Sequence, residues 1–229
     1  MKTLKVLLQG AVAVGLSLVC QGATVVYDNS TNDQLVRFNP GAVEVGDEIL
    51  LAPGPERMIS LFRFQYWGEN FSGDEQIRVR FYANDAFYPS HNASIAPGTP
   101  LYDSGWFNIM ATPRQTILLD YPTLLAGNGG NPVIVPNSFT WTVQFLNVNA
   151  GAGERAGVDI YSPPNVGWNY TSYWENDPIS GWLLKTNQWG IPMDFAAYVE
   201  AVVPEPNVLA LGLGGGLLFL MVRMRVRRS

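Results

Sequence analysis

Residues 60–67 read Ser-Leu-Phe-Arg-Phe-Gln-Tyr-Trp, a stretch in which Phe62, Phe64 and Tyr66 occupy every second position. Alternation with a period of two is the pattern of a β-strand that buries one face, because successive side chains of a strand point to opposite sides. This stretch therefore predicts a strand whose aromatic face lies in the core.

The same alternation recurs in three other stretches, at 76–82, 139–145 and 195–201. In the first of them Arg78 and Arg80 are expected to point outward, away from the core. The residues expected to face the core in the first two stretches are Ile77, Val79, Phe81, Trp141, Val143 and Phe145. Several short alternating segments in one chain favour a sheet protein over a helical one.

Clusters of Gly, Pro and Asn, the residues that form turns, separate these segments. They lie at 39–41, 53–55, 96–98, 127–130 and 163–165. Between residues 24 and 204 we find neither an amphipathic helix of usual length nor a repeat of fixed period. The sequence therefore predicts an all-β fold, a single antiparallel β-sandwich of jelly-roll type that spans residues 24–202.

The charge of this region limits its partners. Between residues 24 and 203 the chain has eight Arg and Lys against eighteen Asp and Glu. Binding to a phosphate backbone needs a basic surface, so nucleic acid is not an expected partner. Cys20 is the only cysteine and His91 the only histidine, which excludes a disulfide framework and multi-histidine metal sites. His91 itself is expected in an exposed polar loop.

The N-terminal segment has the layout of a secretory signal peptide. Lys2 and Lys5 precede an apolar run at 6–19, and the small residues Gly22 and Ala23 follow it. This order of basic, apolar and small residues predicts export and cleavage near residue 23. A short membrane anchor and a lipidated Cys20 are the alternatives.

The C-terminal segment, residues 203–229, carries a second targeting pattern. Pro204, Glu205 and Pro206 precede an apolar stretch at 208–222. Four arginines follow it in the last seven residues: Arg223, Arg225, Arg227 and Arg228. We expect the apolar stretch to form a transmembrane helix, with the arginines on the cytoplasmic side by the positive-inside rule.

A Pro-Glu-Pro motif, a short Gly- and Leu-rich span and a terminal Arg cluster, in that order, resemble the PEP-CTERM sorting signal. The resemblance implies a Gram-negative host that makes extracellular polysaccharide and a processing enzyme of the exosortase type. It makes Pro204, Glu205 and Pro206 residues of a substrate that this enzyme reads. It also implies transient residence in the inner membrane, then the cell surface or the extracellular matrix. A plain single-span anchor is the alternative.

A weaker resemblance lies in the central region. The stretches at 46–49, 78–85 and 97–102 look like the β-sandwich ectodomains common in PEP-CTERM proteins, which generally have no assigned activity. This resemblance implies a fold and adds no site.

Aromatic residues are concentrated near the end of the predicted domain. Four tryptophans, Trp168, Trp174, Trp182 and Trp189, fall within 22 residues. Exposed rings could stack on sugars, with hydroxyl groups bound by Asn165, Asn169, Asn176 and Asp177. The competing interpretation, which we favour from the sequence, is that these rings fill the core and hold loops.

Acidic clusters at 28–33, 47–48 and 74–75 invite a calcium interpretation, but none has the spacing of an EF-hand loop. We expect them to lie in turns and on the surface, and we expect neither a metal site nor a cofactor. No nucleophile elbow or phosphate loop is visible.

The sequence thus predicts a non-enzymatic surface or matrix protein. The alternatives are a module that binds extracellular polysaccharide and, third, a secreted enzyme that degrades polysaccharide.

Overall fold

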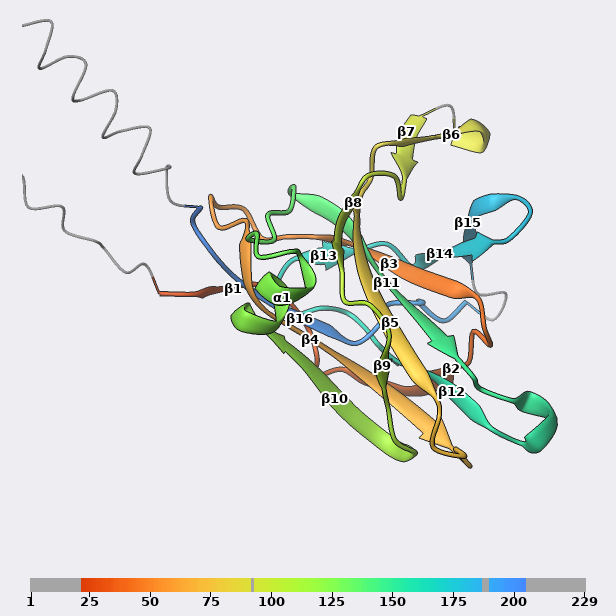
Figure 1. Cartoon of the computed structure of the whole chain (residues 1–229). Helices are drawn as coiled ribbons and strands as arrows, with labels where there is room; N and C mark the ends of the chain where they lie inside the picture. Colours follow the sequence, from red (N-terminus) through yellow and green to blue (C-terminus); the bar gives the residue numbers. More distant parts are fainter. Residues whose placement is uncertain (1–21, 92, 187–189, 205–229) are drawn as a thin grey trace, which may run out of the picture.

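The computed structural model describes residues 22–91, 93–186 and 190–204, which fold into two antiparallel sheets (Figure 1). One sheet has six strands: β1 (Thr24–Asn29), β2 (Asp33–Phe38), β4 (Met58–Glu69), β10 (Thr112–Asp120), β12 (Arg155–Tyr161) and β16 (Ala197–Val202). Their order is β1-β16-β4-β12-β2, and β10 also pairs with β4.

The other sheet has eight strands: β3 (Glu44–Leu50), β5 (Gln76–Ala83), β8 (Pro100–Asp103), β9 (Phe107–Asn108), β11 (Ser138–Leu146), β13 (Trp168–Asn169), β14 (Ser172–Asp177) and β15 (Gly181–Thr186). Their order is β15-β14-β3-β11-β5-β8, with β13 paired to β3 and β9 paired to β5. Strands β6 (Ala86–Tyr88) and β7 (Ala93–Ala96) form a separate hairpin that projects from the body of the molecule (Figure 1).

The core lies between the two sheets and is dominated by aromatic rings. Phe62 of β4 contacts Phe81 of β5 and Trp141 of β11, with ring centroids 4.8 and 5.3 Å apart. These three residues come from opposite sheets and are fully buried. The inward faces predicted for the segments at 60–67, 76–82 and 139–145 are confirmed, as is the all-β, antiparallel character of the described part of the chain.

Helical structure is short. The α-helix α1 (Tyr121–Gly127) has seven residues, and the chain makes 3₁₀ turns at Pro89–His91 and Ala150–Ala152. Asp120 caps α1 by accepting a hydrogen bond from the Thr123 amide at 3.1 Å. Within the described residues no helix combines the length and the apolar character that crossing a membrane requires.

Each of the three acidic clusters expected at the surface contains a residue that the structure buries: Asn29 of β1, Asp47 of β3 and Glu75 in the turn before β5. Asp47 and Glu48 were expected in a surface turn, but both lie within β3, and Asp47 is fully buried. The physical reason is the strand's alternation: Val45 and Ile49 face the core, and Asp47 shares their parity. The apolar neighbours fix the strand's orientation, and the carboxylate follows them inward.

The ends of the sandwich lie side by side, because β1 pairs with β16 from Thr24 opposite Ala201 to Asn29 opposite Ala197. Pro204 follows β16 closely and is partly exposed. The predicted signal peptide up to residue 21, the rest of the Pro-Glu-Pro motif, the apolar span and the Arg cluster lie outside the described residues.

Candidate functional site

The outward-pointing side chains of the eight-stranded sheet, called the outer face below, bring the predicted tryptophans together. Val45, Asp47 and Ile49 of β3 point inward, so Glu44, Gly46, Glu48 and Leu50 point outward. Residues directly opposite each other on antiparallel strands share a face. On β3, Leu50 lies opposite Trp168, and Gly46 lies opposite Trp174. Glu44 lies opposite Asn176 of β14, which in turn lies opposite Trp182 of β15. All three tryptophans therefore point to the outer side of the sheet.

Three of the four predicted tryptophans therefore lie on one face of one sheet. The part of β3 that lies beside them, from Glu44 to Leu50, is about 20 Å long at roughly 3.3 Å per residue. The fourth, Trp189, is outside the described residues.

The three rings differ in how far they are exposed. Trp168 is 50% exposed and meets the exposed Tyr170 edge to face, with centroids 4.5 Å apart. Trp182 is half-buried and contacts Tyr82 at 5.6 Å. Because three strands separate β15 from β5, which carries Tyr82, the β14–β15 hairpin must curl over the outer face. The outer face is therefore curved, not flat.

Trp174 offers no free ring. Only 1% of its surface is exposed, because Tyr88 of the β6–β7 hairpin covers it edge to face at 5.1 Å. The Tyr88 hydroxyl also accepts a hydrogen bond from the Leu184 amide of β15 at 3.2 Å. For this residue the buried interpretation is right, although its ring packs outside the main core, under a hairpin.

A carboxylate network occupies the centre of the outer face. Glu44 is 3% exposed, and both of its oxygens are bound. Its Oε1 accepts from the Thr142 hydroxyl at 2.6 Å and from the Tyr82 hydroxyl at 3.2 Å. Its Oε2 accepts from Arg80 Nη1 at 2.6 Å and from Asn176 Nδ2 at 3.2 Å. Three strands, β5, β11 and β14, thus orient their polar groups around one carboxylate of β3, an arrangement that we call the Glu44 network.

The network continues toward β8. Arg80 Nε lies 3.6 Å from Asp103 Oδ2, and Arg78 forms two hydrogen bonds with the same carboxylate. These bonds hold the pKa of Asp103 below its ordinary value. Burial, followed by the nearby Glu44 carboxylate, raises the pKa of Tyr82 to about 12, so its phenol stays protonated at neutral pH. The Arg78 guanidinium lies 5.7 Å from the Trp106 ring.

A second polar chain lies nearer Trp168. Glu48 Oε1 accepts from the Ser138 hydroxyl at 2.8 Å, and Ser138 Oγ accepts from Asn84 Nδ2 at 2.8 Å. The Thr140 hydroxyl donates to Asn84 Oδ1 at 2.7 Å. Burial raises the pKa of Glu48. The outer face thus combines partly exposed rings with fixed polar groups, a composition that suits a ligand with both apolar and hydroxyl-bearing sides.

Of the polar partners predicted for sugar hydroxyls, the structure places only Asn176 in the Glu44 network. Asn165 donates to the Thr31 hydroxyl at 2.7 Å, away from the outer face. Asp177 accepts from the amides of Ile179 and Ser180 in the β14–β15 turn. Asn169 points inward and is buried.

Sequence reasoning missed Glu44, Tyr82 and Trp106 as residues of the outer face. For Tyr82 and Glu44 the sequence held a signal, because residues an even number of positions apart on a strand point to the same side. Tyr82 is two positions from the outward Arg80, and Glu44 is four positions from Glu48. That signal gives the side of a strand, but it does not tell which strands are neighbours.

Comparisons with protein-family models, with curated proteins and with solved structures found no match to this chain. The case for a function therefore rests on the geometry of the chain itself.

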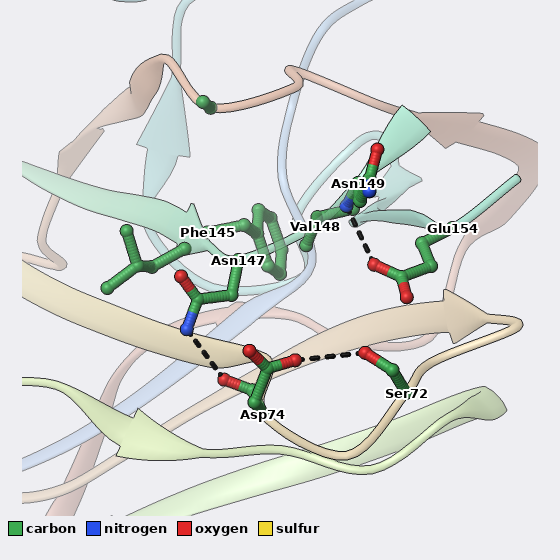
Figure 2. A pocket seen from close by; sticks show the side chains of 9 residues that line it. Ser72, Asp74, Phe145, Asn147, Val148, Asn149 and Glu154 are labelled. Carbon is green, nitrogen blue, oxygen red and sulfur yellow. Dashed lines mark hydrogen bonds between the residues drawn. The ribbon is translucent and has the colours of Figure 1, made fainter. Parts of the chain in front are cut away.

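A pocket of about 360 Å³ lies at the end of the sandwich where loops 70–75 and 147–154 meet (Figure 2). Its two acidic side chains are engaged with neighbouring loop residues. Asp74 Oδ1 accepts from the Ser72 hydroxyl at 2.9 Å, and Glu154 Oε2 accepts from the Asn149 amide at 2.7 Å. Asn147 links the two loops by donating to the Asp74 carbonyl at 3.0 Å. These contacts explain how the loops are held, and they do not by themselves favour hydrolysis.

His91 is exposed, as expected, and its ring stacks on Tyr88 at 5.3 Å. In the part of the chain that the structure describes, no three His, Cys, Asp or Glu side chains are grouped so that they could hold a metal ion.

Proposed function

We propose that this chain is an exported, non-enzymatic protein of the cell surface or extracellular matrix, and that its outer face binds a neutral polysaccharide. The observation that carries the binding proposal is the shared face of Trp168 and Trp182, with the Glu44 network level with Trp182 and Trp168 at the other end of β3. A sugar ring has an apolar C–H face and a rim of hydroxyl groups, and this surface offers partners for both.

The charge of the outer face favours a neutral ligand over an anionic one. Arg80 is paired with Glu44 at 2.6 Å, and Arg78 is paired with Asp103. With these guanidinium groups neutralised and the domain acidic, an anionic polymer would meet repulsion.

The localisation and processing of the protein are a separate part of the proposal. They rest on the signal-peptide pattern and on the PEP-CTERM-like tail, in which the Pro-Glu-Pro motif follows the last strand after one residue, Val203. We propose that an exosortase-type enzyme processes the chain near Pro204, after the 208–222 span has held it in the membrane. The jelly-roll type is also a proposal, supported by repeated passage of the chain between sheets from β2 to β5 and from β10 to β12.

Retention of the full-length protein on immobilised neutral polysaccharides, including the polymer of the producing cell, tests the binding proposal. We expect Trp168→Ala and Trp182→Ala each to weaken binding by roughly 5- to 30-fold, the equivalent of about 1 to 2 kcal/mol for a stacked ring. Tyr121→Ala is the matched control, because Tyr121 is an exposed aromatic on α1, outside the outer face. Unchanged retention of both tryptophan variants, or no retention of the wild type, would contradict the proposal.

The intact mass of the exported protein tests the proposed C-terminal processing. We expect wild type to lose about 25 C-terminal residues and a variant with Ala at 204, 205 and 206 to keep them. An unprocessed tail in both proteins would mean that the segment is only an anchor.

A further inference from the structure

Five polar side chains are buried between the sheets, at the end where β1, β3 and β13 meet the segment before β16. They form what we call the inner cluster: Tyr27, Asn29, Asp47, Asn169 and Asp194, none more than 5% exposed. Tyr27 and Asn29 share the inner face of β1, and Asp47 comes from the inner face of β3. The inner cluster lies on the opposite side of β3 from the Glu44 network.

The backbone of one residue, Phe195, ties the inner cluster together. The Phe195 amide donates to Asp47 Oδ2 at 2.9 Å, and the Phe195 carbonyl accepts from Asn29 Nδ2 at 3.2 Å. Asp194 immediately precedes Phe195 in the chain. Asn169 Nδ2 donates to Asp47 Oδ2 at 3.4 Å. Burial raises the pKa of both Asp47 and Asp194, and hydrogen bonds from Asn169, joined at Asp194 by one from Ser162, partly offset that rise.

Four oxygens of the inner cluster have no hydrogen-bond partner in the described part of the chain. They are the Tyr27 hydroxyl, Asn29 Oδ1, Asp47 Oδ1 and Asp194 Oδ1. Asn29 Nδ2 is held by the carbonyls of Tyr161 and Phe195, so Oδ1 points away from them. Burying an oxygen without a partner is costly, and buried polar groups in folded proteins are nearly always satisfied. Four such atoms in one cluster point to a ligand.

The charge of the inner cluster points to a cation. Neither Asp47 nor Asp194 forms a salt bridge within the described residues. Burial raises the pKa of Asp194 to about 6, and burial followed by the Asp194 carboxylate raises the pKa of Asp47. Two carboxylates thus share an apolar surrounding with no positive side chain against them.

We propose that the inner cluster binds one calcium ion, with Asp47 Oδ1, Asp194 Oδ1 and Asn29 Oδ1 as ligands. Two carboxylate oxygens and an amide oxygen are ligands that calcium prefers, and waters or carbonyls fill its remaining positions. The two negative charges match a divalent ion. The Tyr27 hydroxyl lies near both carboxylates, whose charges add to the rise that burial causes in its pKa. Because the ligands come from both sheets, the ion joins the two layers at this end of the sandwich.

The test uses the full-length protein after removal of metal ions with a chelator. We measure bound calcium by elemental analysis and the melting temperature with calcium or magnesium added. We expect about one calcium per chain and, at 100 times the half-saturating concentration, a rise in melting temperature of about 5 to 10 °C. Asp194→Asn keeps the shape of the side chain and should lose both effects. Asp74→Asn changes an exposed carboxylate outside the inner cluster, so this variant should retain both the bound calcium and the rise in melting temperature.

If no calcium is bound and the melting temperature does not rise at calcium concentrations up to about 10 mM, the proposal is overturned. Protonation would then be what neutralises the two carboxylates. An equal rise with magnesium would overturn the assignment to calcium. Loss of binding in Asp74→Asn but not in Asp194→Asn would place the ion elsewhere and overturn the site. If Asp194→Asn fails to fold, Asn29→Ala provides the same comparison, because it removes a neutral ligand and no charge.

Discussion

The Glu44 network allows a quantitative test of the outer face. Replacing Glu44 by Ala removes an acceptor of four hydrogen bonds. Thr142 is fully buried and the Arg80 side chain is 15% exposed, so water reaches neither group well. The arginine would be left as a largely buried charge without its closest partner.

Breaking a buried ion pair by removing one partner costs about 3 to 5 kcal/mol, because the remaining charge stays desolvated. We place Glu44→Ala at the lower end of that range, about 3 kcal/mol, because Arg80 keeps Asp103 at 3.6 Å. Glu44→Gln should cost less, about 1 to 2 kcal/mol. Its amide oxygen can still accept from Thr142 and Tyr82, but its amide NH₂ group would face the Arg80 and Asn176 donors.

Urea unfolding of the full-length protein, followed by intrinsic fluorescence, measures these losses. Glu175→Ala is the control, because Glu175 forms a more exposed ion pair with Lys185 at 3.6 Å and should cost at most about 1 kcal/mol. A double-mutant cycle of Glu44→Ala with Arg80→Ala should give a coupling above about 1 kcal/mol. A loss for Glu44→Ala no larger than that of the control, with no coupling, would refute the reasoning.

Three further predictions concern other parts of the sandwich. Hydrogen bonds from Arg78 lower the pKa of Asp103, so this carboxylate contributes stability that is complete above its ordinary value near about 4 and is lost as the pH falls through its lowered pKa. Asp103→Asn should therefore reduce stability at pH 7 by at most about 1 kcal/mol and flatten its fall in acid, measured by urea unfolding at several pH values. Gly157→Ala should destabilise by more than about 3 kcal/mol, because the new Cβ would lie 1.9 Å from a backbone carbonyl oxygen of β2; a loss below about 1 kcal/mol would contradict the close approach of these strands. Tyr88→Ala should uncover Trp174 and increase acrylamide quenching of fluorescence, and the increase should vanish when Trp174 is replaced by Phe.

Much of the strand architecture followed from short-range pattern. Phe62, Val79 and Trp141 face the core because each belongs to a segment in which apolar and polar residues alternate. Burial of apolar surface decides which side of such a strand faces inward, and the choice needs no knowledge of the partner strands. The same rule, applied to Val45 and Ile49, would have placed Asp47 inside, but its charge led us to expect the surface.

The candidate sites depended on contacts between residues far apart in the sequence. Asn176 reaches Glu44 across 132 positions, and Phe195 reaches Asp47 across 148. No local pattern encodes such pairs, because strand order and register are set by the packing of the whole sandwich. The sequence by itself determined which residues alternate and where the chain turns. Only the tertiary structure decided that Trp168 and Trp182 share a face, that Tyr88 covers Trp174 and that two carboxylates lie together in the core. A side chain's parity is fixed by its own strand, whereas its neighbours are fixed by every strand that packs around it.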